Sequence, residues 1–242
     1  MQIRYNIHKD KKLVQKPIGG SPYMTRSPFF PSFESLPNAI PIFPLAGAVV
    51  MPGVQLPLNI FEPRYLNMVQ DALANDHIIG MIQPVRDTDE EAVHLQRVGS
   101  AGRITSYSES NDGRIIMVLT GVCRFGVYEE IDTIKGYRRV IADWARFAGD
   151  YDEEDVQLTN REGFFEILHN YIGARRMEIS WDDLGKLTDG PLINLLCTHL
   201  PFEPEEKQML IETIGLDERA ELMRGLMNLY VATRQSLGDK PH

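Results

Sequence analysis

Two short stretches come closest to sequences that perform known chemistry. The first is Gly185-Lys186, because a phosphate-binding loop reads G-x-x-x-x-G-K-[ST] and holds phosphates with its glycine amides. Ser180 replaces the first glycine and Leu187 replaces the hydroxyl residue, so no nucleotide site is predicted. The second is Ser100, but a serine nucleophile elbow needs glycine two residues earlier, where this chain has Val98. We interpret residues 98–102 as the small-residue start of a strand.

Metal binding and acid–base catalysis also lack the necessary groups at the necessary spacing. Cys197 and His199 form the one close pair of soft ligands, whereas structural zinc takes four protein ligands. Asp182-Asp183 and Glu205-Glu206 are adjacent carboxylates, and neighbours in a helix point in different directions. The sequence therefore predicts no metal, no cofactor and no enzymatic activity, since it has neither a Walker A motif nor a Ser/Lys peptidase dyad.

The chain has 242 residues, a formal net charge of -9 and 43% hydrophobic residues, an ordinary balance for a globular protein. Most of the acidic excess falls after residue 150, and such a surface repels a phosphate backbone, so we expect no nucleic-acid partner. Two cysteines cannot build a disulfide framework, and no apolar stretch approaches the ~20 residues that span a bilayer. We predict no membrane partner and a cytoplasmic location.

The N-terminal residues are basic and rich in Gly and Pro, without the apolar core of a secretory signal. We interpret residues 1–37 as a disordered or loosely ordered tail, in which residues 1–23 precede Met24 as a mis-assigned start or as part of that tail. A transit peptide remains an alternative, because acidic residues are scarce there.

Short apolar stretches separated by turn residues predict strands in the first part of the chain. The predicted strands are residues 39–43, 47–51, 55–60, 78–83, 99–108, 114–121, 122–130 and 137–144. One helix is predicted from Pro63, which suits a first helical position, to Asn75-Asp76. Asn111-Asp112-Gly113 predicts a tight hairpin, and closure of so many short strands favours a small barrel.

The period of the apolar residues changes from two to about 3.6 after the charge run at residues 150–155, which predicts a subdomain boundary. The predicted helices are residues 155–171, 181–187 with Ser180 as cap, 191–200, 204–213 and 218–236 with Asp217 as cap. Leu222, Leu226 and Leu229 form an apolar stripe on the last helix, and Met223 and Met227 join it. We interpret the stripe as core, with a Met-rich docking face as the alternative.

Several separated motifs, in the same order, resemble the N-terminal substrate-binding domain of Lon proteases. The motifs are Ile40-Pro41-Ile42-Phe43-Pro44-Leu45, Met51-Pro52-Gly53, the run from Leu56 to Tyr65, Val98-Gly99-Ser100-Ala101, Asp112-Gly113-Arg114, Gly121-Val122-Cys123-Arg124-Phe125 and, in the helical half, Leu192 to Pro201, Lys207-Gln208 and Asp217 to Leu229. The resemblance implies an α+β fold, with a PUA-like β-barrel subdomain at residues 38–149 followed by a helical bundle at residues 150–242. Residues 38–236 together would form the Lon N-terminal-like domain.

The same resemblance implies a role in recognition alone, because a Lon protease also carries an ATPase module and a Ser/Lys peptidase that this chain does not contain. The implied partners are exposed segments of other proteins. Our candidate contact residues are Phe61, Glu62, Arg64 and Tyr65, which follow a Pro-rich turn. The alternative interpretation is that Phe61 and Tyr65 pack the strand–helix junction while Glu62 and Arg64 pair with each other or with neighbours of Arg124.

Two other functions remain open. PUA-like folds often bind RNA, and Arg138, Arg139 and Arg146 could contact phosphates in such a protein. An enzyme or small-molecule binder could use a cleft between the strands and the helices. A deep polar pocket with strongly shifted carboxylates would favour that third function.

Overall fold

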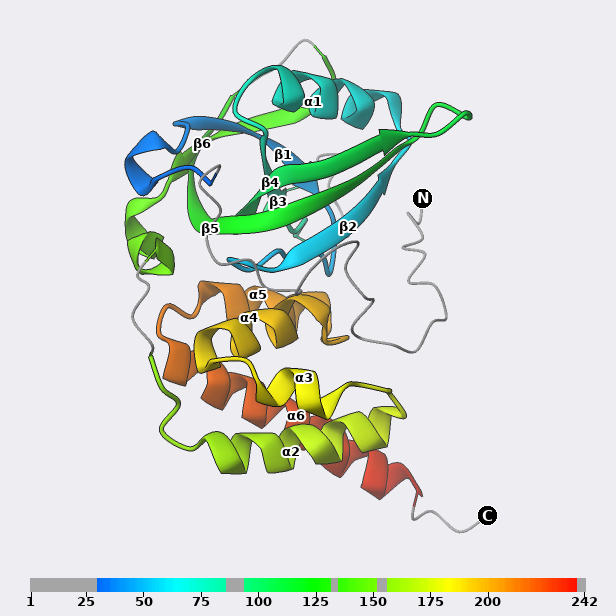
Figure 1. Cartoon of the computed structure of the whole chain (residues 1–242), viewed down its shortest axis with the longest axis vertical. Coiled ribbons are helices and arrows are strands. Elements are labelled where there is room, and N and C mark those ends of the chain that lie inside the picture. Colours follow the sequence, from blue (N-terminus) through cyan, green and yellow to red (C-terminus); the bar gives the residue numbers. More distant parts are fainter. Residues whose placement is uncertain (1–29, 86–93, 132–134, 152–155, 239–242) are drawn as a thin grey trace.

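The computed structural model describes residues 30–85, 94–131, 135–151 and 156–238, in which a β-sheet lies above a group of helices (Figure 1). The strands are β1 (Ala39–Pro44), β2 (Gln55–Ile60), β3 (Ile78–Ile82), β4 (Val98–Glu109), β5 (Ile115–Ile131) and β6 (Arg138–Asp143). The helices are η1 (Phe33–Ser35), α1 (Pro63–Ala74), η2 (Ala145–Tyr151), α2 (Arg161–Arg175), α3 (Trp181–Gly185), α4 (Asp189–His199), α5 (Pro204–Glu212) and α6 (Leu216–Gly238). The predicted mixed α+β class is confirmed.

The six strands are ordered β2-β5-β4-β3-β1-β6, and β6 also pairs with β5. Five strands therefore form a closed circuit of hydrogen-bonded neighbours, while β2 lies outside that circuit against β5. The long strand β5 makes this arrangement, because its first part pairs with β2 and its last part pairs with β6. β1 and β3 are parallel and the other paired strands are antiparallel.

The predicted hairpin joins β4 to β5. Gly113 has a φ of 79°, a backbone conformation that glycine adopts without steric cost. The division of β5 into two strands, 114–121 and 122–130, was wrong. Gly102 pairs with Gly121 and Ala101 pairs with Cys123, so Val122 is the extra residue of a β-bulge and the strand continues through it.

The predicted strand at residues 47–51 was also wrong, because this segment is a buried connection outside the sheet. The Val50 amide donates to Ser100 Oγ at 2.9 Å, and the Met51 amide donates to Thr198 Oγ1 at 3.1 Å. The two hydroxyl groups thus accept hydrogen bonds from the amides that, in a strand, would donate to a neighbouring strand. The connection also passes so close to β5 that a Cβ atom on Gly121 would lie 2.0 Å from the Met51 carbonyl oxygen.

Local signals placed several helix ends correctly. α1 begins at Pro63 and ends at Ala74, with Asn75 as its C-cap, and the Ser180 hydroxyl accepts a hydrogen bond from the Asp183 amide at the start of α3. α2 begins at Arg161, where the Asn160 side chain caps it, later than the predicted residue 155, which lies outside the described residues.

The predicted cap of the last helix was wrong. α6 begins at Leu216, so Asp217 lies inside its first turn. The Asp217 carboxylate instead accepts hydrogen bonds from the amide and the hydroxyl of Thr159. It thereby joins α6 to the segment before α2.

Two apolar clusters fill the interior. One cluster lies between α1 and the sheet and contains Tyr65 and Met68. The larger cluster runs from strand residues such as Ile42 through the 49–54 connection into the helices. Met223 and Met227 are fully buried in it, which confirms the core interpretation for the two methionines and rules out a Met-rich docking face. Leu229, at the end of the same stripe, is 62% exposed and is not core.

Residues 30–37, which belong to the predicted tail, pack against the 3-10 helix η2 and the residue before it. The Trp144 indole donates to the Pro37 carbonyl at 3.0 Å, and the Tyr151 hydroxyl donates to the Pro31 carbonyl at 3.2 Å. Residues 1–29 lie outside the described residues.

Candidate functional site

The four candidate contact residues lie where β2 ends and α1 begins. Pro63 occupies the first helical position, and the Glu62 carbonyl accepts hydrogen bonds from the Tyr65 and Leu66 amides. The turn is therefore held by the first hydrogen bonds of the helix. It presents the side chains before and after Pro63 in fixed directions.

Tyr65 belongs to the interior. Its side chain is buried, and its ring lies 4.4 Å from the ring of Phe43 on β1, between centroids. Burial raises the pKa of the Tyr65 phenol above its ordinary value. The Arg64 guanidinium covers this ring, 4.5 Å from its centroid.

Glu62 and Arg64 form an ion pair, with Arg64 Nη2 2.9 Å from Glu62 Oε2. Phe61, in contrast, is 51% exposed. The structure thus agrees with the alternative interpretation for Tyr65 and for the Glu62–Arg64 pair, and differs from it for Phe61. Contact of these four residues with a polypeptide stays a prediction.

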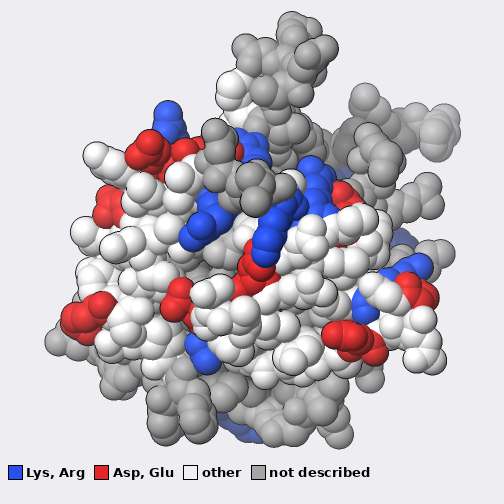
Figure 2. Space-filling model, turned by 90° about the horizontal axis from the view of Figure 1, so that it is seen from above, with Lys and Arg blue, Asp and Glu red and all other residues white. Residues whose placement is uncertain are grey.

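Several Lys and Arg side chains gather near one another on the α1 side of the molecule, with acidic side chains among them (Figure 2). Lys135 Nζ lies 2.6 Å from Asp71 Oδ1, and Arg138 pairs with Glu130. The hydrogen bonds from Lys135 and Tyr137 lower the pKa of Asp71. A phosphate that bound here would have to compete with these carboxylates for the cations.

Arg146, the third residue of the RNA alternative, lies on η2. Its guanidinium donates to the Glu212 carbonyl at 3.2 Å and lies 5.1 Å from the Phe147 ring centroid. Arg138 and Arg146 each have protein partners in the structure. No described contact joins the two arginines into one surface.

The free edge of β2 is a feature that the sequence analysis did not single out. Among the described residues, β2 pairs with β5 along one side and has no strand along its other side. Pro57 and Asn59 are exposed on this strand. The signal was present in the sequence, because proline within a strand favours an edge position.

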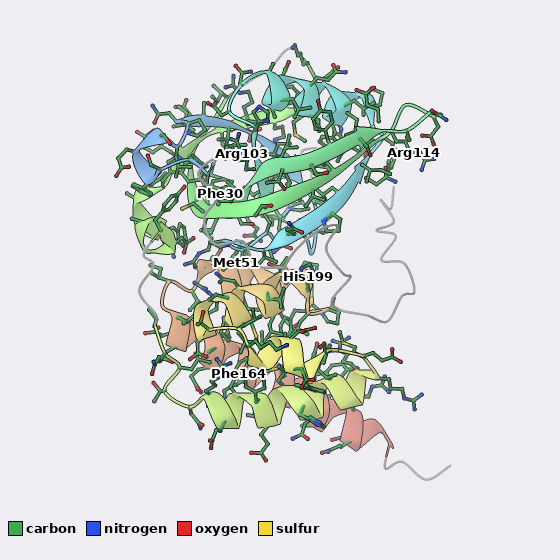
Figure 3. All side chains as sticks on the ribbon, in the orientation of Figure 1. Phe30, Met51, Arg103, Arg114, Phe164 and His199 are labelled. Atoms are coloured by element: carbon green, nitrogen blue, oxygen red, sulfur yellow. The ribbon has the colours of Figure 1, made fainter. Side chains whose placement is uncertain are left out.

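Met51 and His199 lie where the sheet meets the helices (Figure 3). Buried polar side chains, Arg124 among them, cross this interface. Arg124 on β5 is 2% exposed and pairs with Asp150, with Nη2 2.7 Å from Oδ1. Its guanidinium also donates to the carbonyls of Ile211, Thr213 and Ile214, which follow or end α5. Arg124 therefore fixes the helices against the sheet.

Cys197 and Lys207 are also buried at this interface, and His199 is partly buried there. Lys207 Nζ donates to the Thr198 carbonyl at 2.7 Å, and burial lowers the Lys207 pKa to about 8. Burial lowers the His199 pKa to about 4, while its ring donates to the Gln55 carbonyl. Burial raises the pKa of the Cys197 thiol. At neutral pH the His199 imidazole is therefore neutral and the Cys197 thiol is protonated, and both side chains lie between α4 and its neighbours.

The side chains considered for chemistry are placed as follows. Ser100 is buried in β4, where its hydroxyl accepts the Val50 amide, so the prediction of a strand start is confirmed. A Cβ atom on Gly99 would lie 2.5 Å from the Phe125 ring, which explains the small residues. In the described ranges, no three His, Cys, Asp or Glu side chains lie close enough together to hold a metal ion.

A shallow hollow of about 400 Å³ lies between α2 and α6. It is lined by Asn170, Ala174, Val231, Arg234 and Gln235. This lining contains no carboxylate, so the hollow is not the acid–base pocket that an enzyme would need. None of the helices that the structure describes is long and apolar enough to cross a membrane.

The fold is that of known N-terminal domains of Lon proteins. A crystal structure of a Lon N-terminal domain protein from Xanthomonas campestris matches with a TM-score of 0.57 and 22% identity, over 77% of this chain and 97% of that chain. The N-terminal domain of a Mycobacterium avium complex Lon protease matches with a TM-score of 0.57 and 16% identity, over 78% of this chain and 98% of that chain. The class is therefore a mixed α+β domain with a six-stranded sheet and helices, similar to these domains.

The family model of the ATP-dependent protease La (LON) substrate-binding domain matches residues 39–228, so this chain belongs to that family. The resemblance seen in the sequence is thereby confirmed. It includes all four candidate contact residues and the whole of β2.

Curated relatives match over most of this chain. A Lon protease from Anaeromyxobacter dehalogenans is 26% identical over 81% of this chain and 24% of its own length. Lon protease 2 from Myxococcus xanthus is 25% identical over 90% of this chain and 27% of its own length. The chain thus spans about a quarter of the length of these relatives.

Proposed function

We propose that this chain binds exposed segments of other polypeptides and performs no reaction on them. The observation that supports this function is the match of a substrate-binding domain family to residues 39–228. The buried polar groups agree with it, because Arg124, His199 and Lys207 have structural partners. The whole proteases among its relatives have activities that are not attributed to this chain.

The proposal includes a finer description of the fold. The closed circuit of five strands corresponds to a PUA-like β-barrel subdomain at residues 38–149, and the helices correspond to a bundle subdomain at residues 150–242. Residues 1–29 would be a tail, whereas residues 30–37 pack against η2 and belong to the folded part. The chain would act in the cytoplasm. The double pairing of β6 supports the barrel description.

Phe61 is the side chain best placed to contact a client, because it is large, apolar and half exposed beside a rigid helix start. Aromatic side chains with such positions often dominate binding energy. Glu62 and Arg64, paired beside it, would form the polar rim. Tyr65 would support the site from the interior of the domain, where its ring packs against Phe43.

The test measures fluorescence anisotropy of labelled α-lactalbumin, unfolded by reduction and carboxymethylation, against the whole chain. We expect binding of the unfolded protein and none of native α-lactalbumin. Phe61→Ala should weaken binding about tenfold, because it removes an apolar anchor. Leu229→Ala is the matched control, because Leu229 is 62% exposed but lies on α6, and it should leave binding unchanged.

Equal binding of native and unfolded α-lactalbumin would contradict the proposal, and so would no binding of either. If the Phe61→Ala variant binds as tightly as the unchanged chain, the contact with the client lies elsewhere than at this junction. Retention of RNA that falls steeply with salt would favour the RNA alternative instead.

A further inference from the structure

The register of β2 on β5 determines which backbone groups point away from the sheet. In an antiparallel pair, residues alternate between those that bond their partner and those whose N–H and C=O point outward. Pro57 lies opposite Val118 and has no N–H, so its position is one that points outward. Asn59 lies two residues further along the same strand. Its N–H and C=O therefore also point outward.

One hydrogen bond confirms which positions point outward. The Gly121 amide donates to the Val54 carbonyl at 2.8 Å, which makes Val54 an inward position immediately before β2. Gln55 is then an outward position, and its backbone is the one that interacts with His199 of α4. The outward positions of β2 are thus Gln55, Pro57 and Asn59. Gln55 is already in contact with α4 through His199, whereas Pro57 and Asn59 face the free edge.

This edge has one of the features that protect a strand from pairing, Pro57, and lacks charged side chains and bulges. Exposed edges are commonly blocked by proline, by charged side chains, by bulges or by a covering segment. β2 has the sequence QLPLNI and contains no charged residue, and its ladder with β5 has no irregularity. Pro57 removes one donor, but its carbonyl and both groups of Asn59 remain as they are in an ordinary edge strand.

We propose that an extended segment of a client polypeptide binds by adding to the free edge of β2 as a further strand. The added strand would exchange both backbone hydrogen bonds with Asn59 and donate one to the Pro57 carbonyl. Its alternate side chains would lie on the face of Leu58 and Ile60, where apolar residues fit, and its end would reach the exposed Phe61. The inference rests on the proposed function and names its substrate class: extended segments with alternating apolar residues.

The first test separates the backbone of Asn59 from its side chain. Asn59→Pro removes the outward N–H and leaves the hydrogen bonds to β5, as Pro57 shows two residues earlier. Asn59→Ala removes the side-chain amide and keeps the N–H. With the same labelled, unfolded α-lactalbumin, we expect about tenfold weaker binding by Asn59→Pro, since a client carbonyl is left unpaired, and nearly unchanged binding by Asn59→Ala.

The second test needs no variant and so does not depend on how well Asn59→Pro folds. The probes are a ten-residue peptide of alternating valine and threonine, and the same peptide N-methylated at every second amide, which blocks one hydrogen-bonding edge. We expect the unmethylated peptide to bind and to slow amide exchange of Asn59, and the methylated peptide to bind at least tenfold more weakly. Equal binding of the two peptides would overturn the inference.

The outcomes distinguish this inference from the proposed function. If the unfolded protein binds, but Asn59→Pro and Asn59→Ala bind it equally well, the function stands and the edge is not its site. If the unfolded protein does not bind at all, the function itself is wrong. Formation of dimers that Asn59→Pro abolishes would assign the edge to a second copy of this chain, and would also overturn the inference.

Discussion

Arg124 shows how much one buried side chain contributes to this architecture. Its guanidinium pairs with Asp150 and reaches three backbone carbonyls near the end of α5. A charge removed from water needs such a complete set of partners. Arg124 lies on β5, and its partners come from η2, from α5 and from the residues that follow α5.

Asp150→Asn should destabilise the chain by about 3 kcal/mol, because it leaves the buried Arg124 guanidinium without its counter-charge. The measurement is the free energy of unfolding in urea. Asp112→Asn is the matched control, since the Asp112–Arg114 pair is exposed at the hairpin, and it should leave stability nearly unchanged. Similar losses in the two variants would contradict a special role for the buried pair.

Part of the candidate site could be predicted from the sequence. The motif that ends in Phe61, Glu62, Pro63, Arg64 and Tyr65 located the strand–helix junction, because Pro63 and the helical spacing are local signals. Which side chains are exposed depends on long-range packing. Tyr65 is buried because Phe43 lies beside it, and nothing near Tyr65 in sequence indicates that contact.

At the scale of elements, the strands and helices followed local patterns, and the errors arose where distant groups supplied hydrogen bonds. The 47–51 segment has the apolar pattern of a strand, but Ser100 and Thr198 take its amides. The bulge at Val122 resembled a strand boundary because Gly121 precedes it. The edge position of β2 depends on the order of all six strands, and Pro57 is the local signal that could have indicated it.

The close packing of β4 on β5 gives a prediction at this scale. Gly99→Ala should lower the free energy of unfolding by about 2 kcal/mol, because its Cβ would lie 2.5 Å from Phe125 and 2.7 Å from the Met81 carbonyl oxygen. Gly225 lies in α6, and a Cβ atom there would meet no atom of another element within 4 Å. Gly225→Ala should therefore raise the free energy of unfolding by roughly 0.5–1 kcal/mol. Urea unfolding measures both changes. Equal effects of the same sign would show that the contacts at Gly99 are unimportant.

The molecule as a whole is joined by one apolar cluster and by polar contacts that cross from helices to strands. The cluster includes residues from both the strands and helices α2, α4, α5 and α6. His199 links α4 to β2 through the Gln55 carbonyl, immediately before the free edge. The helices therefore position the strand that we propose as the binding edge.

This link predicts a pH dependence of stability. His199 has a pKa of about 4 in the folded chain and an ordinary value of 6.5, so between these pH values the unfolded chain binds the proton first. The free energy of unfolding should fall as the pH falls from 6.5 to 4. His199→Gln, which keeps a donor for the Gln55 carbonyl, should show a smaller fall over this range. Parallel curves for the two proteins would exclude His199 as the cause.

The shared cluster also has a consequence for how binding is lost on heating. A chain whose strands and helices bury one another's apolar surfaces should melt in a single cooperative step, with no surviving half that keeps a working edge. A captured segment would then be released abruptly, over the same few degrees in which the fold disappears. The temperature range over which a client segment is bound would therefore be set by the folding equilibrium of the whole chain.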